Sequence, residues 1–173
     1  MNGTLKRLLP LMSRRAVRKM EWAAANPREA QERFLRMLLK KESQTAFGKE
    51  HCFAEITSVE EYRSRVPIRD YEGFRPYVDR MLAGEKGVLS REEPFMYATT
   101  SGTTGQAKLV PITKSFRKSL TSTSRYWLNR VFKDHPTCFD GTFFIPTSPA
   151  IEGYTDRGVP YGSMGQGTSR CQF

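Results

Sequence analysis

A run of small hydroxyl residues and glycines lies between two apolar segments of the 173-residue sequence. It reads Thr99-Thr100-Ser101-Gly102-Thr103-Thr104-Gly105-Gln106-Ala107-Lys108, with five hydroxyl side chains, two glycines and a terminal lysine. Binding a polyphosphate takes backbone N–H groups that turn toward an anion, short hydroxyl donors and a cation. Glycine permits such a backbone by tolerating positive φ. This stretch therefore has the residue types of a phosphate-binding loop.

A polar hairpin loop is the competing interpretation, because Ser, Thr and Gly are ordinary turn residues. The run is not the nucleotide-binding pattern GxxxxGK[ST], since Gly102 and Gly105 are three residues apart and Lys108 follows after another three. Ser101 as a hydrolytic nucleophile is disfavoured, because the GxSxG pattern does not surround it. A phosphate loop of another kind and a structural hairpin both remain.

The order of residues from 100 to 108 resembles the ATP phosphate loop of the adenylate-forming superfamily, which includes acyl-CoA synthetases, nonribosomal peptide adenylation domains and luciferases. Further segments are similar, in order and spacing, to the auxin-responsive-promoter (Gretchen Hagen) family of acyl-acid amido synthetases. These segments span residues 45–51, 66–71, 80–85 and 108–113. The similarity runs from about residue 27 to residue 163. It looks closer to the bacterial branch than to the plant hormone-conjugating enzymes.

This resemblance implies a ligase that activates a small-molecule carboxylic acid with ATP, with Mg²⁺ present, and releases pyrophosphate. An amine, usually an amino acid, would then attack the acyl-adenylate to form an amide. The loop residues that would bind the ATP phosphates are Thr100, Ser101, Gly102, Thr103, Thr104, Gly105 and Lys108. Hydroxyls would donate hydrogen bonds, glycines would let the backbone approach, and Lys108 would anchor the loop or add positive charge. The following helix occupies the region that shapes the acid pocket in this family.

Histidines and cysteines form no metal-binding pattern in the sequence. His51 and His135 are the only histidines and lack the spacing of ligands, so we expect them on the surface or in packing. The three cysteines, at positions 52, 138 and 171, include no CxxC pair, which argues against a disulfide framework and a cysteine zinc site. We expect no metal site and a reducing, cytoplasmic location.

Capping residues and apolar spacing predict the helices that position the loop. They span residues 27–41, 58–65, 70–84 and 114–133. Pro76 should kink or restart the third helix, and Gly84 should end it. Strand character marks residues 95–98, 109–111 and 142–145, whereas glycines and prolines after residue 146 deny any long regular element. The fold class is α/β: N-terminal helices, then the first strands and a helix of an adenylate-forming-type large domain, incomplete.

The formal net charge of +10 is concentrated near the start, because residues 1–41 carry 11 basic and 3 acidic side chains. The first twenty residues hold six basic residues and no acidic ones: Lys6, Arg7, Arg14, Arg15, Arg18 and Lys19. They resemble a transit peptide or a membrane-surface helix, although we favour an amphipathic helix that packs its apolar stripe on the rest of the fold. The alternative function is a non-enzymatic module that binds acidic membrane or nucleic acid through this helix. We expect no nucleic-acid binding, because no aromatic residues are interleaved with these basic residues, and no apolar run approaches the ~20 residues of a transmembrane helix.

The last ten residues depart from the family pattern. Enzymes of this kind continue well beyond this length, with an adenine pocket and a mobile C-terminal domain. We therefore expect residues 1–163 to be the N-terminal part of the adenylate-forming domain and residues 164–173 to be an atypical tail, which a frameshift would explain. No complete catalytic set is expected in such a fragment, so the chain alone should be inactive.

Overall fold

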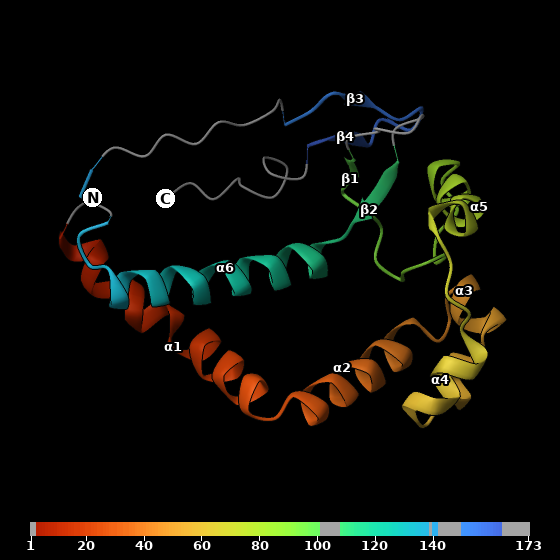
Figure 1. The fold of residues 1–173 in the computed structure, drawn as a ribbon. Helices are drawn as coiled ribbons and strands as arrows, with labels where there is room; N and C mark the ends of the chain where they lie inside the picture. The colour runs from red at the N-terminus through yellow and green to blue at the C-terminus, as the bar shows by residue number, and fades with distance from the viewer. Residues whose placement is uncertain (1–2, 101–107, 139, 142–149, 164–173) are drawn as a thin grey trace. The chain divides into compact units, whose positions relative to one another are not determined.

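The computed structural model describes residues 3–100, 108–138, 140–141 and 150–163. It contains helices and a small sheet in the order shown in Figure 1. The chain forms two compact units, one of residues 1–30 and 116–146 and the other of residues 31–115 and 147–173. No helix in the described ranges combines the length and the apolar character needed to cross a bilayer.

The first unit contains α1, Gly3–Ala25, and most of α6, Lys114–Asp134. The Asn129 side chain of α6 donates a hydrogen bond of 2.7 Å to the hydroxyl of Ser13, a buried residue of α1. Helix α6 matches the predicted bounds to within one residue. It holds no buried residue, and Trp127 is 60% exposed.

In the second unit, short polar side chains cap several helices, including the short helix at residues 46–50 that was not predicted from the sequence. The long helix α2, Pro27–Glu42, starts at the predicted proline and leads into α3, Ala46–Glu50. Thr45 caps α3, and Ser58 caps α4, Val59–Arg65, by accepting from the Glu61 N–H at 3.1 Å. Between α3 and α4 lies a single 3₁₀ turn, Phe53–Glu55. Satisfied N–H groups at each start fix where the chain becomes helical.

Helix α5, Tyr71–Leu82, begins after Asp70, whose carboxylate accepts from the Gly73 N–H at 3.0 Å. It runs unbroken through Pro76, so the predicted restart at this residue is wrong. A proline costs the helix one N–H donor, and three buried residues that follow it, Tyr77, Val78 and Met81, keep the helix packed. Gly84, with φ +92°, follows the helix end as predicted.

An aromatic cluster around Phe47 is the centre of the core of this unit. The Phe47 ring meets Phe53, Phe74 and Tyr77 at centroid distances of 5.8, 5.8 and 5.2 Å. The contacts with Phe53 and Tyr77 are edge-to-face, a geometry that adds to the free energy gained by burying the rings. The core therefore joins α3, the 3₁₀ turn and α5.

A four-stranded sheet completes the second unit, in the order β2-β1-β4-β3. Strand β1, Met96–Thr99, pairs antiparallel with β2, Leu109–Ile112, as the strand pattern predicts. It pairs parallel with β4, Pro160–Ser163, which forms a hairpin with the two-residue β3, Gly153–Tyr154. Strands β3 and β4 were not predicted from the sequence, and the strand predicted at 142–145 lies outside the described residues. The α/β fold class is confirmed.

Candidate functional site

The predicted phosphate loop joins two paired strands of the sheet. The register pairs Thr99 with Leu109, and the Thr100 N–H donates to the Lys108 carbonyl at 3.2 Å. The hairpin interpretation is therefore right for the flanks of the loop, and it is compatible with phosphate binding between them. Five predicted site residues lie outside the described residues: Ser101, Gly102, Thr103, Thr104 and Gly105.

Lys108, at the end of this loop, has an ammonium group with no direct ion pair in the described part of the chain. The Glu72 carboxylate is near enough that, after Arg75, the charge of Lys108 also lowers its pKa. Lys108 is half-buried, and its Nζ lies 5.6 Å from the centroid of the Tyr71 ring. No ion pair or hydrogen bond joins that Nζ to any described side chain, although most neighbouring cations have one, such as Arg75 with Glu72 at 2.6 Å. A half-buried cation that forms no direct ion pair can bind an anionic ligand.

The carboxyl ends of β1 and β4 meet at one edge of the sheet. Their parallel register places Thr99 beside Ser163. The Thr99 hydroxyl donates a hydrogen bond to the Glu152 carboxylate at 3.0 Å, just before β3. In α/β sheets, ligands bind outside the carboxyl ends of parallel strands, and the predicted loop leaves the sheet at this edge.

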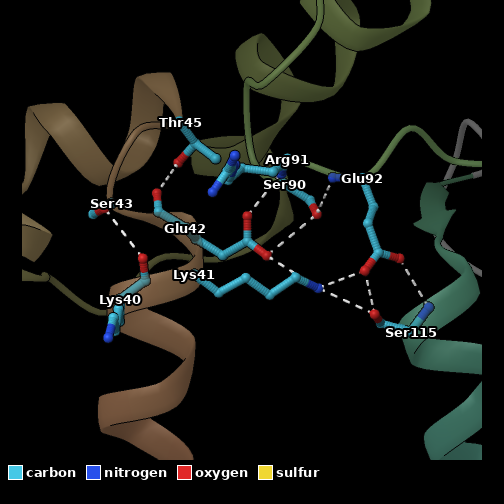
Figure 2. A network of polar contacts seen from close by, with 9 residues as sticks. All are labelled: Lys40, Lys41, Glu42, Ser43, Thr45, Ser90, Arg91, Glu92 and Ser115. Atoms are coloured by element: carbon cyan, nitrogen blue, oxygen red, sulfur yellow. Dashed lines mark hydrogen bonds and ion pairs between the residues drawn. The ribbon is translucent and has the colours of Figure 1, made fainter.

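A polar network fixes the start of α6, the helix that follows the hairpin (Figure 2). The Glu92 carboxylate accepts from the Ser115 N–H at 2.9 Å and from the Ser115 hydroxyl, and the Lys41 ammonium donates to it at 2.6 Å. The Lys41 ammonium and the Ser115 donors hold the pKa of the Glu92 carboxyl at about 2, well below its usual range. The buried Glu42 carboxylate accepts from the Arg91 N–H at 2.7 Å. These bonds tie the end of α2 to the first turn of α6.

The two histidines take the packing and surface places expected for them. His51 is buried with its ring 4.4 Å from that of Phe47, and its Nε2 lies 3.2 Å from the Arg69 guanidinium. His135 is exposed. Within the described ranges, no group of three or more His, Cys, Asp or Glu residues could hold a metal ion.

A groove of about 260 Å³ lies between the end of α5 and the sheet. The Tyr97 side chain lines it and is 1% exposed, and burial raises the pKa of its hydroxyl. The charged residues on its rim hold partners of their own: Glu85 with Arg80, Lys86 with Glu93, and Arg157 with the Ala83 carbonyl. The charged groups of this groove are therefore already engaged, so we place the candidate anion site at Lys108 instead.

The sequence did not single out Tyr71 or Glu92 as site residues, and it offered Glu152 only as a weak candidate, in a Pro/Gly loop that resembles a family segment near the active site. Tyr71, Glu92 and Glu152 contact partners 38, 23 and 53 positions away in the chain. Such contacts leave no periodic signal in a sequence. The only signal for Tyr71 was its place in the segment 66–71, which the family resemblance had singled out.

Comparisons with known proteins identify the class to which this fold and site belong. The structure of GH3.15 acyl acid amido synthetase superposes with a TM-score of 0.71 at 23% identity, over 83% of this chain and 26% of that one. The structure of AtGH3.15 acyl acid amido synthetase in complex with 2,4-DB superposes with a TM-score of 0.69 at 21% identity, over 95% and 28%. The fold is thus that of part of an acyl acid amido synthetase.

The family follows from the sequence match. Residues 16–172 match the GH3 family N-terminal domain, and the chain belongs to this family. Indole-3-acetic acid-amido synthetase GH3.15 of Arabidopsis thaliana is 25% identical over 147 residues, which are 84% of this chain and 24% of that protein. The chain therefore spans about a quarter of the length of the relatives it matches. Its assignment to a bacterial branch, the 163/164 boundary and the cytoplasmic location stay predictions.

Proposed function

We propose that this chain supplies the ATP phosphate-binding part of an acyl-acid amido synthetase reaction. The supporting observation is Lys108, a half-buried cation without a direct ion pair among the described residues, at the end of a hairpin loop of hydroxyl residues and glycines, where the nearby Glu72 carboxylate is bound by Arg75. Family membership supports the reaction class, because the named relatives are amido synthetases. The acid and amine substrates of the whole enzyme belong to this proposal.

Phosphate binding would act on charge that develops during adenylation. As pyrophosphate leaves, negative charge grows on the β and γ phosphate oxygens, so fixed N–H, hydroxyl and ammonium groups aimed at them lower the barrier. Lys108 would supply the ammonium and Thr100 a hydroxyl, together with the predicted donors from 101 to 105. The described residues offer no metal cluster. Mg²⁺ would enter with the nucleotide and share the charge of its phosphates.

The chain alone should not complete the amide-forming reaction. It spans about a quarter of the length of the synthetases it matches. A loop that binds phosphates leaves the acid and the amine without a defined site. We therefore propose ATP binding without synthetase turnover for the 173-residue chain.

The direct test is the affinity of the purified chain for MgATP, measured by isothermal titration calorimetry. Removing a charge-assisted hydrogen bond costs about 1.5–3 kcal/mol, so we expect Lys108→Ala to weaken binding roughly 10-fold or more. Lys133→Ala removes the same charge from the exposed end of α6 and should bind as the wild type does. Absence of MgATP binding by the wild type, or equal loss in both variants, would overturn the proposal.

The alternative function through the basic helix α1 predicts a different pattern. Arg14, Arg15, Arg18 and Lys19 are exposed on this helix. Changing all four to Gln would abolish binding to anionic vesicles if that function held, because such binding depends on clustered positive charge. The same variant should keep the wild-type MgATP affinity if the phosphate-binding proposal is right.

A further inference from the structure

Tyr71 makes a double hydrogen bond to the strand that follows the phosphate loop. Its hydroxyl accepts from the Leu109 N–H at 2.9 Å and donates to the Leu109 carbonyl at 3.1 Å. The ring of the same residue lies under the Lys108 ammonium, 5.6 Å from centroid to Nζ. One side chain therefore contacts both the cation and the backbone next to it.

The pairing of the hairpin explains why the backbone N–H and carbonyl of Leu109 are available to the Tyr71 hydroxyl. In an antiparallel pair, the N–H and carbonyl of alternate residues point toward the partner strand and then away from it. The Thr100 N–H donates to the Lys108 carbonyl, so the polar groups of Leu109, the next residue, point away from β1. Strand β2 is at the edge of the sheet, where no strand follows it among those described. The Tyr71 hydroxyl takes the place of that missing strand at Leu109.

Tyr71 is itself held in place by the start of α5. Asp70 caps the helix through the Gly73 N–H, and a Cβ at Gly73 would lie 3.0 Å from the Arg69 side chain, so the chain is tightly packed there. Arg75 also lies over the Tyr71 ring, at 5.2 Å, but Glu72 pairs with its guanidinium through two bonds of 2.6 and 2.8 Å. Of the two cations on this ring, Lys108 is therefore the one without a direct ion pair in the described ranges, and Glu72 interacts with its charge only at longer range.

We propose that Tyr71 is a positioning residue for polyphosphate binding, acting through Lys108 and Leu109. This inference rests on the proposed function, since it assumes that Lys108 binds phosphate. The hydroxyl fixes the strand end from which Lys108 projects, and the ring limits where the ammonium can lie by a cation–π contact. The Tyr71 side chain itself does not contact the nucleotide.

A double-mutant cycle for MgATP affinity tests this role in the 173-residue chain. Tyr71→Phe removes the hydroxyl and keeps the ring. We expect it to weaken MgATP binding roughly 5-fold in the wild type and less than about 2-fold when Lys108 is already Ala, because residues that act as one unit are not additive. Inorganic tripolyphosphate should give the same ratios, since Lys108 acts on phosphate oxygens.

Tyr77→Phe is the matched control on the same helix. The Tyr77 hydroxyl donates to Glu50 at 2.6 Å and accepts from Arg69 at 3.0 Å, in the core of the unit. Its loss should lower the melting temperature and leave MgATP affinity within 2-fold of the wild type. A purely structural role of Tyr71 would give the pattern of Tyr77→Phe.

The outcomes separate this inference from the proposed function. If Lys108→Ala binds MgATP as the wild type does, the phosphate-binding proposal fails. If Lys108→Ala weakens binding but Tyr71→Phe does not, or weakens it equally in both backgrounds, only the role of Tyr71 is overturned. Amide hydrogen exchange at Leu109 can be measured in the wild type, so this test does not depend on a variant that folds. The Leu109 N–H donates to the Tyr71 hydroxyl, and saturating MgATP should slow its exchange. An unchanged exchange rate contradicts the inference.

Discussion

Some residues in the segments that resemble the family stabilise the local backbone and are not placed to contact a ligand. Thr45 is fully buried, and its hydroxyl accepts from the Gly48 N–H at 2.9 Å and donates to the Glu42 carbonyl at 2.7 Å. A Cβ at Gly48 would lie 2.2 Å from the same carbonyl oxygen. The segment 45–51 is therefore constrained by packing. Tyr71 and Lys108, in two other segments, face the candidate site.

The close approach at Gly48 makes a stability prediction. Gly48→Ala should lower the free energy of unfolding by about 1–3 kcal/mol, because a backbone carbonyl must move to admit the methyl group. Gly141→Ala is the control, since an added Cβ there meets nothing within 4 Å. Urea denaturation measures both. Equal stability of the two variants would contradict the packing described around Glu42 and Gly48.

At the scale of elements, capping residues and apolar spacing predicted most helices, whereas the elements that were missed depend on contacts between residues far apart in the chain. Helices α2, α4 and α6 begin where prolines and capping residues indicate, and β1 and β2 flank the hydroxyl-rich loop as expected. Strands β3 and β4 could not be predicted from their residues. They are two and four residues long, lie among glycines and prolines, and exist because β4 pairs with β1, some sixty positions earlier. The helix restart predicted at Pro76 does not occur, and the reason again lies outside the local sequence. Burial of the side chains that follow Pro76 stabilises the helix by more than the loss of one backbone N–H donor destabilises it.

The junction of α2 and α6 predicts how stability depends on pH. The pKa of Glu92 is about 2 in the folded chain, below the ~4.3 of an unfolded glutamate. Its contribution is therefore complete above about pH 4.3 and is lost as the pH falls toward 2. Because the pair is partly exposed, we expect Glu92→Gln to cost about 1–2 kcal/mol at pH 7.

Denaturation at several pH values checks this prediction. The difference between wild type and Glu92→Gln should shrink steadily below pH 4 and vanish near pH 2. Glu93→Gln, which removes an exposed pair with Lys86, is the control and should cost less than about 0.5 kcal/mol. A loss for Glu92→Gln that is the same at pH 7 and pH 2 would contradict the network of Figure 2.

At the scale of the whole chain, a candidate phosphate site exists within a sequence about a quarter as long as its relatives. The family and the α/β class could be inferred from five short segments, because the loop string is specific. The two units and the polar network could not, because they depend on contacts between residues far apart in the chain. The chain alone should therefore bind MgATP but show no carboxylate-dependent exchange between ATP and pyrophosphate, which a radiolabel assay measures. Exchange at the rate of a full synthetase would contradict this.

The most direct test of phosphate binding is a titration of the isotopically labelled chain with MgATP, followed residue by residue by NMR. We expect saturable shifts in the amide signals from Thr100 to Leu109 and in the Lys108 side-chain ammonium signal, with little change around Phe47 or in α1. Lys108→Ala should weaken the fitted affinity roughly 10-fold at the same amide signals. Shifts that are absent, that map to other residues, or that persist unchanged in Lys108→Ala would contradict the account.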